Sequence, residues 1–417
     1  MSEIEVHIAL GGGTLRVGTL FRQAARARES VTFQYHRGWL DRPERFSLEP
    51  GLLVGEGAFH PTGDRDMFGA IGDSAPDTWG RRLMQRAERR RAATEGRSVR
   101  TLHEADYLLG VADISRLGAL RFKEPGDAVF QRPVEEGVPG FVALARLLAS
   151  AGRIERDEET DEDLLMIFAP GSSLGGARPK ASVIDPAGAL AIAKFPKPAD
   201  DYSVEAWEHV ALNLAARAGI RTPRNELHDV GKSRVFISWR FDRIGSTRVP
   251  FLSAMSMLGA KDGERASYPE IVDALSKHGA EAKSDAEELF RRMVFSILIS
   301  NVDDHLRNHG FLWRGKGGWT LSPVYDLNPI PTDLKARILT TNISLDEGTC
   351  SLDLALEQAG FFGLSLQKAK AVAAEVGAAV SNWRNVAAAV GESRRAIDRM
   401  ASAFEHDDLA AAKRLAS

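Results

Sequence analysis

The sequence predicts an α+β fold in which a mixed α/β N-terminal region precedes a mostly helical C-terminal lobe. Residues 15–20 and 31–35 alternate apolar and polar side chains, as half-buried strands do. Residues 181–184 and 190–195 predict two further strands, joined in a hairpin by a turn. From about residue 254 the pattern is mostly helical to the C-terminus, and this order of elements is typical of α+β proteins.

Two helices are predicted within the mixed region. One spans residues 203 to about 218, and Gly219 is placed to end it. The other spans residues 77–91 and carries six arginines: Arg81, Arg82, Arg86, Arg89, Arg90 and Arg91. These arginines are interpreted either as a solvated helix face or as a contact with DNA or a protein partner. The acidic residues 157–163 are interpreted as a linker or an exposed helix start.

Composition limits the class of protein. The chain has 417 residues, 44% of them apolar, which is enough for two or three domains with real cores. Its net charge of −3 is nearly balanced and does not indicate a protein that attracts nucleic acid or acidic membranes over its whole surface. Cys350 is the only cysteine, which excludes intramolecular disulfides and Cys-rich zinc sites. There is no signal-peptide pattern and no bilayer-length apolar run, so we expect a soluble, cytoplasmic protein with no membrane partner.

The most informative stretch is a polar loop after the apolar residues 294–299, with the sequence Asn301-Val302-Asp303-Asp304-His305-Leu306-Arg307-Asn308. Asp303 and Asn308 have the D-x-x-x-x-N spacing of a protein-kinase catalytic loop, where a carboxylate orients the acceptor hydroxyl and an amide oxygen holds Mg²⁺. Asp304 is one residue out of register and is the poorer candidate for the base. His305 is expected to hold the loop by hydrogen bonding or to contact phosphate. The alternative is an Asx-rich turn after a helix.

A second carboxylate completes the predicted magnesium site. Asp326 follows the apolar pair Val324 and Tyr325, so a carboxylate leaves what looks like a buried strand. Mg²⁺ prefers a few protein oxygens together with phosphate and water, so Asp326 is expected to bind it with Asn308. The alternative is an aspartate that begins a turn before Asn328-Pro329.

Lys194 is the candidate phosphate-binding lysine. It lies in the apolar strand Leu190-Ala191-Ile192-Ala193-Lys194-Phe195, where an unpaired buried ammonium would be costly. In kinases, a strand lysine holds the α- and β-phosphates and pairs with a glutamate on the next helix. Helical periodicity places Glu205 toward water and Glu208 inward, so Glu208 is the predicted partner. The alternative is a surface lysine on an edge strand.

A glycine-rich segment, residues 171–180, precedes the lysine strand. Glycines allow backbone N–H groups to approach phosphates closely, and Arg178 and Lys180 add positive charge. The segment matches neither of the common glycine-rich nucleotide motifs. Its order along the chain is what gives it weight: glycine-rich loop, lysine, helix glutamate, Asp…Asn and a final Asp follow one another as in protein kinases.

These residues resemble the HipA family, the kinase toxins of bacterial toxin–antitoxin modules. The resemblance rests on the residues at 175–180, 194–196, 239–243, 301–308 and 325–327, which read Gly-Gly-Ala-Arg-Pro-Lys, Lys-Phe-Pro, Trp-Arg-Phe-Asp-Arg, Asn-Val-Asp-Asp-His-Leu-Arg-Asn and Tyr-Asp-Leu. Residues 33–35, 47–48, 77–81 and 117–122 resemble the N-terminal domain of that family. The likeness runs through most of the chain in matching order.

The resemblance implies a two-lobed, protein-kinase-like fold and assigns roles by motif. Asp303 would be the catalytic base, Lys194 would contact the ATP phosphates, and Asn308 and Asp326 would hold Mg²⁺. The phosphate loop would supply the remaining nucleotide contacts from Ser173, Gly175, Gly176, Ala177, Arg178 and Lys180. Ser173 matches a serine that family members autophosphorylate. A phosphate there would add about −2 of charge beside ATP and repel it.

The resemblance also implies domains and partners. We expect an N-terminal subdomain at 1–125, a nucleotide-binding region like a kinase N-lobe at 126–245, and a helical C-terminal kinase lobe at 246–417. Family members phosphorylate components of translation, and a HipB-like helix-turn-helix antitoxin that binds operator DNA neutralises them. We therefore predict an ATP- and Mg²⁺-dependent Ser/Thr protein kinase toxin, with operator DNA reached through the antitoxin complex.

Two other functions are consistent with parts of this pattern. One is a non-catalytic partner-binding or co-repressor protein, based on the arginine-rich helix at 77–91. The intact set of Lys194, Asp303, Asn308 and Asp326 argues against it. The other is a small-molecule or lipid kinase, which would use the same site and cannot be separated from a protein kinase by motifs.

Overall fold

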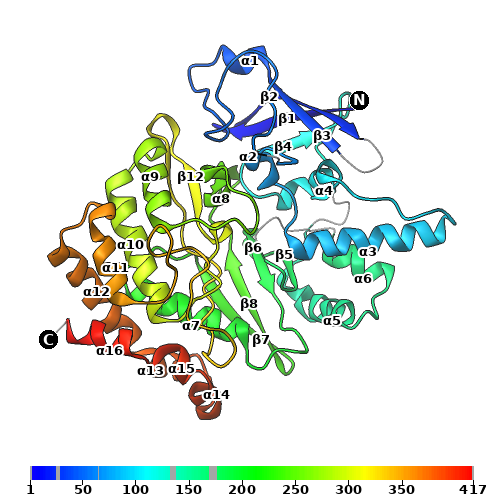
Figure 1. Cartoon of the computed structure of the whole chain (residues 1–417). Helices are drawn as coiled ribbons and strands as arrows, with labels where there is room; N and C mark the ends of the chain where they lie inside the picture. The colour runs from blue at the N-terminus through cyan, green and yellow to red at the C-terminus, as the bar shows by residue number, and fades with distance from the viewer. Residues whose placement is uncertain (1, 25–28, 64, 132–137, 169–175, 416–417) are drawn as a thin grey trace. The chain divides into compact units, whose positions relative to one another are not determined.

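Figure 1 shows the computed structural model, which describes residues 2–24, 29–63, 65–131, 138–168 and 176–415. The chain folds into two compact units. The first unit comprises Met1–Ala199 with His228–Leu252, and the second comprises Asp200–Leu227 with Ser253–Ser417.

An antiparallel sheet begins the first unit. Its strands are β1 (Ser2–Leu10), β2 (Gly13–Ala24), β3 (Glu29–Tyr35) and β4 (Leu120–Lys123), in the order β3-β2-β1-β4. On β3 every second residue, Val31, Phe33 and Tyr35, is buried, as the alternating pattern predicts. The two strands predicted at 15–20 and 31–35 are therefore confirmed as β2 and β3.

The helices of the first unit lie between β3 and the second sheet in sequence. They are α1 (Arg37–Leu40), α2 (Gly69–Gly72), α3 (Thr78–Thr94), α4 (Glu104–Gly110), α5 (Leu144–Glu155) and α6 (Asp161–Phe168), with short 3-10 helices at Asp113–Ser115 and Phe141–Ala143. The predicted arginine-rich helix is α3. Its N-cap is Asp77, whose side chain accepts a hydrogen bond of 2.8 Å from the Gly80 N–H.

Most of the arginines of α3 pair with acidic residues of the same unit. Arg86 lies 2.9 Å from Glu159, and Arg90 lies 3.4 Å from Asp161. Arg81 donates two hydrogen bonds, of 2.6 and 2.7 Å, to Glu104. The acidic run thus pairs with α3 as α6 begins, and Glu159 is buried rather than part of an exposed linker. This internal pairing favours a structural role for the arginines over a contact with DNA.

The second sheet carries the predicted lysine strand. It contains β5 (Lys180–Ile184), β6 (Leu190–Lys194), β7 (Asn225–Val230) and β8 (Ser233–Trp239), in the order β5-β6-β8-β7. The predicted hairpin is formed by β5 and β6, and Gly188 adopts a φ of +84° in its turn. Apolar side chains of β5, β6 and β8 form one core with α3, α5 and α6. Short strands β9 (Arg243–Ile244), β10 (Thr247–Arg248) and β11 (Phe251–Ser253) follow.

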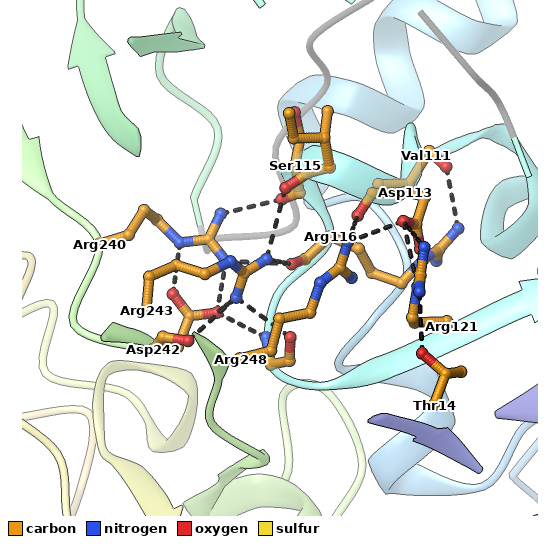
Figure 2. A network of polar contacts seen from close by, with 12 residues as sticks. Thr14, Val111, Asp113, Ser115, Arg116, Arg121, Arg240, Asp242, Arg243 and Arg248 are labelled. Atoms are coloured by element: carbon orange, nitrogen blue, oxygen red, sulfur yellow. Dashed lines mark hydrogen bonds and ion pairs between the residues drawn. The ribbon is translucent and has the colours of Figure 1, made fainter. Parts of the chain in front are cut away.

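A network of arginines joins residues 111–121 to residues 240–248 within this unit (Figure 2). Asp242 accepts hydrogen bonds of 2.6 Å from Arg240, Arg243 and the Gly118 N–H. Burial acts to raise the pKa of Asp242, but Arg240 and Arg243 outweigh it and hold the pKa below its ordinary value. The quoted motifs at 117–122 and 239–243 therefore meet in one buried cluster.

In this cluster, the terminal nitrogens of Arg116 donate hydrogen bonds to backbone carbonyls. Arg116 is fully buried and donates to the carbonyl oxygens of Ser74, Leu108 and Val111, at 2.8, 2.9 and 2.9 Å. Its guanidinium also lies 4.7 Å from the centre of the Phe122 ring. Arg116 therefore connects Ser74, which follows α2, with the end of α4, and it lies against Phe122 of β4.

The second unit is mostly helical, as predicted. Its helices are α7 (Val204–Arg217), α8 (Ala254–Leu258), α9 (Tyr268–His278), α10 (Ala282–Leu298), α11 (Leu352–Glu357), α12 (Leu366–Val380), α13 (Trp383–Ala389), α14 (Arg394–Arg399), α15 (Ala401–Phe404) and α16 (Asp407–Arg414), with 3-10 helices at Leu306–Asn308, Gly315–Gly317 and Gln358–Phe362. Strands β12 (Gly310–Trp313) and β13 (Trp319–Leu321) pair antiparallel. Residues 322–351 contain no helix or strand, which the sequence pattern did not predict.

Helix α7 confirms the helix predicted at 203–218, and Gly219 follows it with a φ of +76°. Its Trp207 packs near Trp383 of α13 and Phe404 of α15, and these last two rings stack 4.5 Å apart. Helix α10 runs through this core with its last turn fully buried. The chain therefore leaves α10 from inside the second unit.

We predict that Arg116→Ala lowers the free energy of unfolding by about 3 kcal/mol or more, because three buried carbonyls lose their donor. Urea unfolding measures this change. Arg146→Ala is the control in the same unit, since the Arg146 side chain is 68% exposed, and it should change stability by no more than about 0.5 kcal/mol. Equal losses in the two variants would contradict the role assigned to Arg116.

Candidate active site

The predicted catalytic loop, residues 300–308, begins where α10 ends. Ser300 adopts a φ of +53°, an uncommon conformation for a residue with a side chain. Its hydroxyl donates to the Ala403 carbonyl at 2.8 Å and accepts from Arg337 at 3.0 Å. The Ser300 hydroxyl thus holds the turn that leads the chain out of the core through two hydrogen bonds, one donated and one accepted.

Asp303 lies at the surface of this loop. Its side chain is 56% exposed, and Oδ1 lies 3.3 Å from Nζ of Lys335. Its carbonyl oxygen accepts hydrogen bonds of 3.0 Å from the His305 N–H and from Nδ2 of Asn308. The backbone of Asp303 is therefore fixed while its carboxylate stays accessible, as a base that meets a substrate hydroxyl requires.

Asn308 has the most informative side chain of the loop. It is buried, and its Nδ2 bond to the Asp303 carbonyl sets the orientation of the amide. Within the part of the chain that the structure describes, its Oδ1 is buried and has no hydrogen-bond partner. Buried polar atoms are normally paired, so an orphaned amide oxygen points to a missing partner, which is a hydrogen-bond donor, a water or a metal ion.

Asp326 belongs to a second loop that lies against the first. Tyr325 donates from its hydroxyl to the Arg307 carbonyl at 2.6 Å, so the residues adjoining Asp326 and Asn308 touch. The Asn328 N–H donates to Oδ1 of Asn301 at 3.0 Å. Asp326 itself has a φ of +59°, the kind of strained backbone that clusters at functional sites.

These two side chains fit a magnesium ion by the chemistry of their donors. Asn308 supplies an amide oxygen and Asp326 a carboxylate, both hard oxygen ligands of the kind that Mg²⁺ takes in small numbers beside phosphate and water. The orphaned Oδ1 of Asn308 is the observation that supports this fit. If residues 301–308 were only an Asx-rich turn, that buried oxygen would need a water or another donor as its partner.

Asp304 has a different role from its neighbour. It is 3% exposed, it accepts a hydrogen bond from the Tyr268 hydroxyl, and its Oδ1 lies 3.0 Å from Nε2 of His309. Tyr268 and His309 are buried as well. Burial, and then the Asp304 carboxylate, raise the pKa of Tyr268 well above its ordinary value. These contacts anchor the loop from inside and leave Asp303 as the accessible carboxylate.

His305 lies at the edge of a pocket of about 670 Å³ in the second unit, which Leu306, Arg307 and Lys335 also line. Its Nδ1 is buried and has no hydrogen-bond partner among the described residues. The predicted contact with phosphate or within the loop stays a prediction.

Lys194 ends β6, where it stands opposite Lys180 of β5 and Phe236 of β8. Its Nζ lies 5.8 Å from the centre of the Phe236 ring. Because β6 has a neighbour on each side, the alternative of a surface lysine on an edge strand is excluded.

Glu208 is buried on α7, as predicted, but Glu205 is buried too, with 1% exposed. The expectation that Glu205 faces water was wrong, because helical periodicity reports which residues share a face and not which faces other segments cover. Helical periodicity therefore does not separate the two glutamates. Lys194 belongs to the first unit and Glu208 to the second, so their pairing stays a prediction.

Only part of the glycine-rich segment lies within the described residues. Ser173 and Gly175 fall outside them, and so does the predicted autophosphorylation site. Gly176 has a φ of +107°, Ala177 is exposed, and Arg178 is half-buried.

Lys180 was predicted to add charge near phosphate. In the structure, it is buried and its Nζ lies 2.6 Å from Oδ2 of Asp77, the N-cap of α3. Trp79 donates from its ring nitrogen to the Lys180 carbonyl at 3.1 Å and from its backbone to Gly176 at 3.3 Å. The motif at 77–81 thus holds the end of the glycine-rich segment, and the role of Lys180 toward phosphate stays a prediction.

Comparison with known proteins now places the chain. Residues 172–399, more than half of it, match the model of the HipA-like C-terminal domain. This chain belongs to the HipA family. The resemblance read from the motifs is therefore confirmed.

Relatives and a solved structure agree with that assignment. "Putative kinase" of Haemophilus influenzae is 24% identical over 164 residues, 35% of this chain and 48% of that protein. "Putative kinase Y4dM" of Sinorhizobium fredii is 30% identical over 119 residues, 28% of each chain. This HipA-family chain thus spans about half the length of the first relative and less than a third of the second.

The fold is that of HipA along nearly the whole chain. A chain of the Shewanella oneidensis MR-1 toxin–antitoxin complex of HipA, HipB and operator DNA superposes with a TM-score of 0.71 at 16% identity, covering 98% of this chain and 96% of that one. The predicted HipA-like α+β fold is confirmed. Among the described residues, no helix combines the length and apolar character needed to cross a membrane.

The sequence did not single out several residues that shape this site. Asn301 and Tyr325 lie inside the recognised motifs and were not assigned a role, although they join the two loops. Arg337 and Lys335 lie in the irregular segment, 37 and 32 residues from their contacts at Ser300 and Asp303. A basic residue in a segment without periodicity gives no sequence signal of such a contact.

We predict that alanine substitutions at the two adjacent aspartates lower the free energy of unfolding by different amounts. Asp304→Ala should lower the free energy of unfolding by about 2–4 kcal/mol, because the buried Tyr268 hydroxyl loses its acceptor and His309 loses its neighbouring carboxylate. Asp303→Ala should change it by no more than about 0.5 kcal/mol, since its carboxylate is exposed. Urea unfolding of both variants measures this difference. A large loss in Asp303→Ala would show that the two roles are assigned to the wrong residues.

Proposed function

We propose that this HipA-family protein is an ATP- and Mg²⁺-dependent Ser/Thr protein kinase that acts as the toxin of a toxin–antitoxin module. The observation that carries the proposal is the pairing of an accessible Asp303 with an adjacent buried Asn308 whose Oδ1 is orphaned. Phosphoryl transfer needs these two groups, a carboxylate for the acceptor hydroxyl and an oxygen for the metal. The kinase names of the relatives support the same reaction class.

Each of these residues is proposed to have a separate role in phosphoryl transfer. Asp303 orients the acceptor hydroxyl and takes its proton as the bond to phosphorus forms. Asn308 and Asp326 would hold Mg²⁺, which when bound neutralises charge on the phosphates of ATP. Lys194 contributes a fixed positive charge to the α- and β-phosphates, with Glu208 as its predicted partner. His305 and the glycine-rich segment, including Gly175, Gly176, Ala177, Arg178 and Lys180, remain the predicted phosphate contacts.

Regulation and partners follow from the family. Phosphorylation of Ser173 would place negative charge beside the nucleotide and stop the kinase. The complex of the structurally similar HipA with HipB and operator DNA supports a HipB-like antitoxin for this chain, with operator DNA bound through that complex. The phosphorylated protein is proposed to be a component of translation in the cytoplasm.

Asp303→Ala is predicted to lower the rate of phosphoryl transfer at least about 100-fold, to the point where transfer is effectively abolished. The acceptor hydroxyl loses its base while the fold is unchanged. Transfer is measured with [γ-³²P]ATP and a bacterial lysate, with Asp353→Ala, on α11, as the control. Undiminished labelling in Asp303→Ala would refute the assignment of the base. Label in small molecules or lipids rather than in protein bands would refute the protein-kinase assignment.

Lys194→Ala is predicted to weaken ATP binding by about tenfold, since a charge-assisted contact is worth roughly 1.5–3 kcal/mol. Calorimetric titration with ATP and Mg²⁺ measures the dissociation constant. Lys232→Ala, in the turn between β7 and β8, should bind ATP as the wild type does. Equal affinities in the wild type and Lys194→Ala would remove Lys194 from the nucleotide site.

A further inference from the structure

An irregular segment, residues 331–342, runs along the catalytic loop and is fastened to it. The Thr341 N–H donates to the Asp304 carbonyl at 2.9 Å, and the Thr340 hydroxyl donates to the Val302 carbonyl at 3.0 Å. These bonds connect the two segments on either side of Asp303. The position of the segment relative to the predicted base is therefore set by the backbone.

Arg337 provides the main anchor of this segment. Its Nε donates to the Ser300 hydroxyl at 3.0 Å, and Nη2 donates to the Ile297 carbonyl at 2.9 Å. Its Nη1 pairs with Asp408 of α16 at 2.8 Å. With all three arms of the guanidinium engaged and the side chain 19% exposed, the residues just before Arg337 have little freedom to move.

Lys335 precedes this anchor by two residues and reaches the predicted base. Its Nζ lies 3.3 Å from Oδ1 of Asp303, and its side chain is 47% exposed. Lys335 also lines the pocket of about 670 Å³ that His305 and Arg307 border. Lys335 thus contacts the accessible carboxylate and also lines a space large enough for part of a substrate.

We propose that Lys335 is a further catalytic residue, which binds the phosphoryl group during its transfer. This inference rests on the proposed kinase function. An acceptor hydroxyl must lie about 2.6–3.2 Å from the Asp303 carboxylate to lose its proton to it. Because the Lys335 ammonium lies beside that carboxylate, it is within reach of the phosphoryl oxygens when they arrive at the hydroxyl.

The step balances without any additional reactant. The acceptor oxygen bonds to the γ-phosphorus, the bond from that phosphorus to the bridging oxygen breaks, and its electron pair leaves with ADP. The acceptor's proton passes to Asp303. Lys335 keeps its own protons and donates hydrogen bonds to the phosphoryl oxygens, where positive charge lowers the barrier most if it is already in position.

The proposed role makes a specific prediction, because Lys335 would bind the phosphoryl group in the transition state and not in the ground-state complex with ATP. Lys335→Ala should lower the rate of phosphoryl transfer about 100-fold, the effect of removing one preorganised donor. Its affinity for AMP-PNP with Mg²⁺ should stay within about threefold of the wild type. Its affinity for ADP with aluminium fluoride, which resembles the transition state, should fall by about the same factor as the rate.

A chemical rescue tests the charge itself. Cys350 is the only cysteine of the chain and is buried, so Lys335→Cys introduces one accessible thiol. Alkylation of that thiol with 2-bromoethylamine restores an ammonium on a side chain of nearly lysine length. The alkylated variant should regain most of the rate, and Lys335→Arg should regain part of it. Alkylated wild type controls for any reaction at Cys350.

Lys368→Ala is the matched control for loss of a surface ion pair. Lys368 lies 2.9 Å from Glu287, and these side chains are 50% and 36% exposed, comparable to the 47% and 56% of Lys335 and Asp303. It should leave the rate, both affinities and the melting temperature unchanged.

The rate is measured with [γ-³²P]ATP and Mg²⁺, as phosphate release to water and as label in the proteins of a bacterial lysate. An active wild type with an equally active Lys335→Ala overturns the inference. A faster Lys335→Ala also overturns it, because Lys335 would then restrain the base. If the Lys335→Cys variant is folded and alkylation does not restore its rate of phosphoryl transfer, the inference is also overturned. A wild type that transfers phosphate to neither water nor protein overturns the proposed function itself.

Discussion

A polar loop that leaves a buried helix must find hydrogen-bond partners for its backbone, and the geometry of the candidate site depends on where they come from. Helix α10 ends in the core at Leu298, so the chain turns at Ser300 with a positive φ. Unpaired buried peptide groups would cost several kcal/mol there. Arg337, Tyr325 and Thr341 from the following segment donate hydrogen bonds to backbone carbonyls of the loop and of the end of α10, and in doing so they bring Asp326 and Lys335 to the loop.

The two adjacent aspartates show how a difference in burial gives identical side chains different roles. Inside the core, Asp304 accepts a hydrogen bond from Tyr268, and its carboxylate lies beside His309. Asp303 is exposed because the loop turns its carboxylate outward while its carbonyl is held by Asn308. One aspartate can therefore serve the fold and the other the substrate, although the sequence offers the same residue type twice.

In the first unit, charge is neutralised within the molecule. Most arginines of α3 pair with carboxylates such as Glu104 and Glu159, and the terminal nitrogens of Arg116 donate to carbonyl oxygens. The buried pair of Asp77 and Lys180 joins the start of α3 to the strand that follows the glycine-rich segment. Basic residues that looked available for nucleic acid or phosphate are thus used to connect elements far apart in sequence.

The sequence by itself determined the family, the α+β class and the main elements, because these depend on local periodicity and on motifs whose spacing is read directly. It also favoured Asp303 over Asp304. Only the tertiary structure decided that Glu205 is buried beside Glu208, that Lys180 is paired with Asp77, and that Lys335 lies beside Asp303. Burial and ion pairing depend on which distant segments pack together, and neither periodicity nor composition records that.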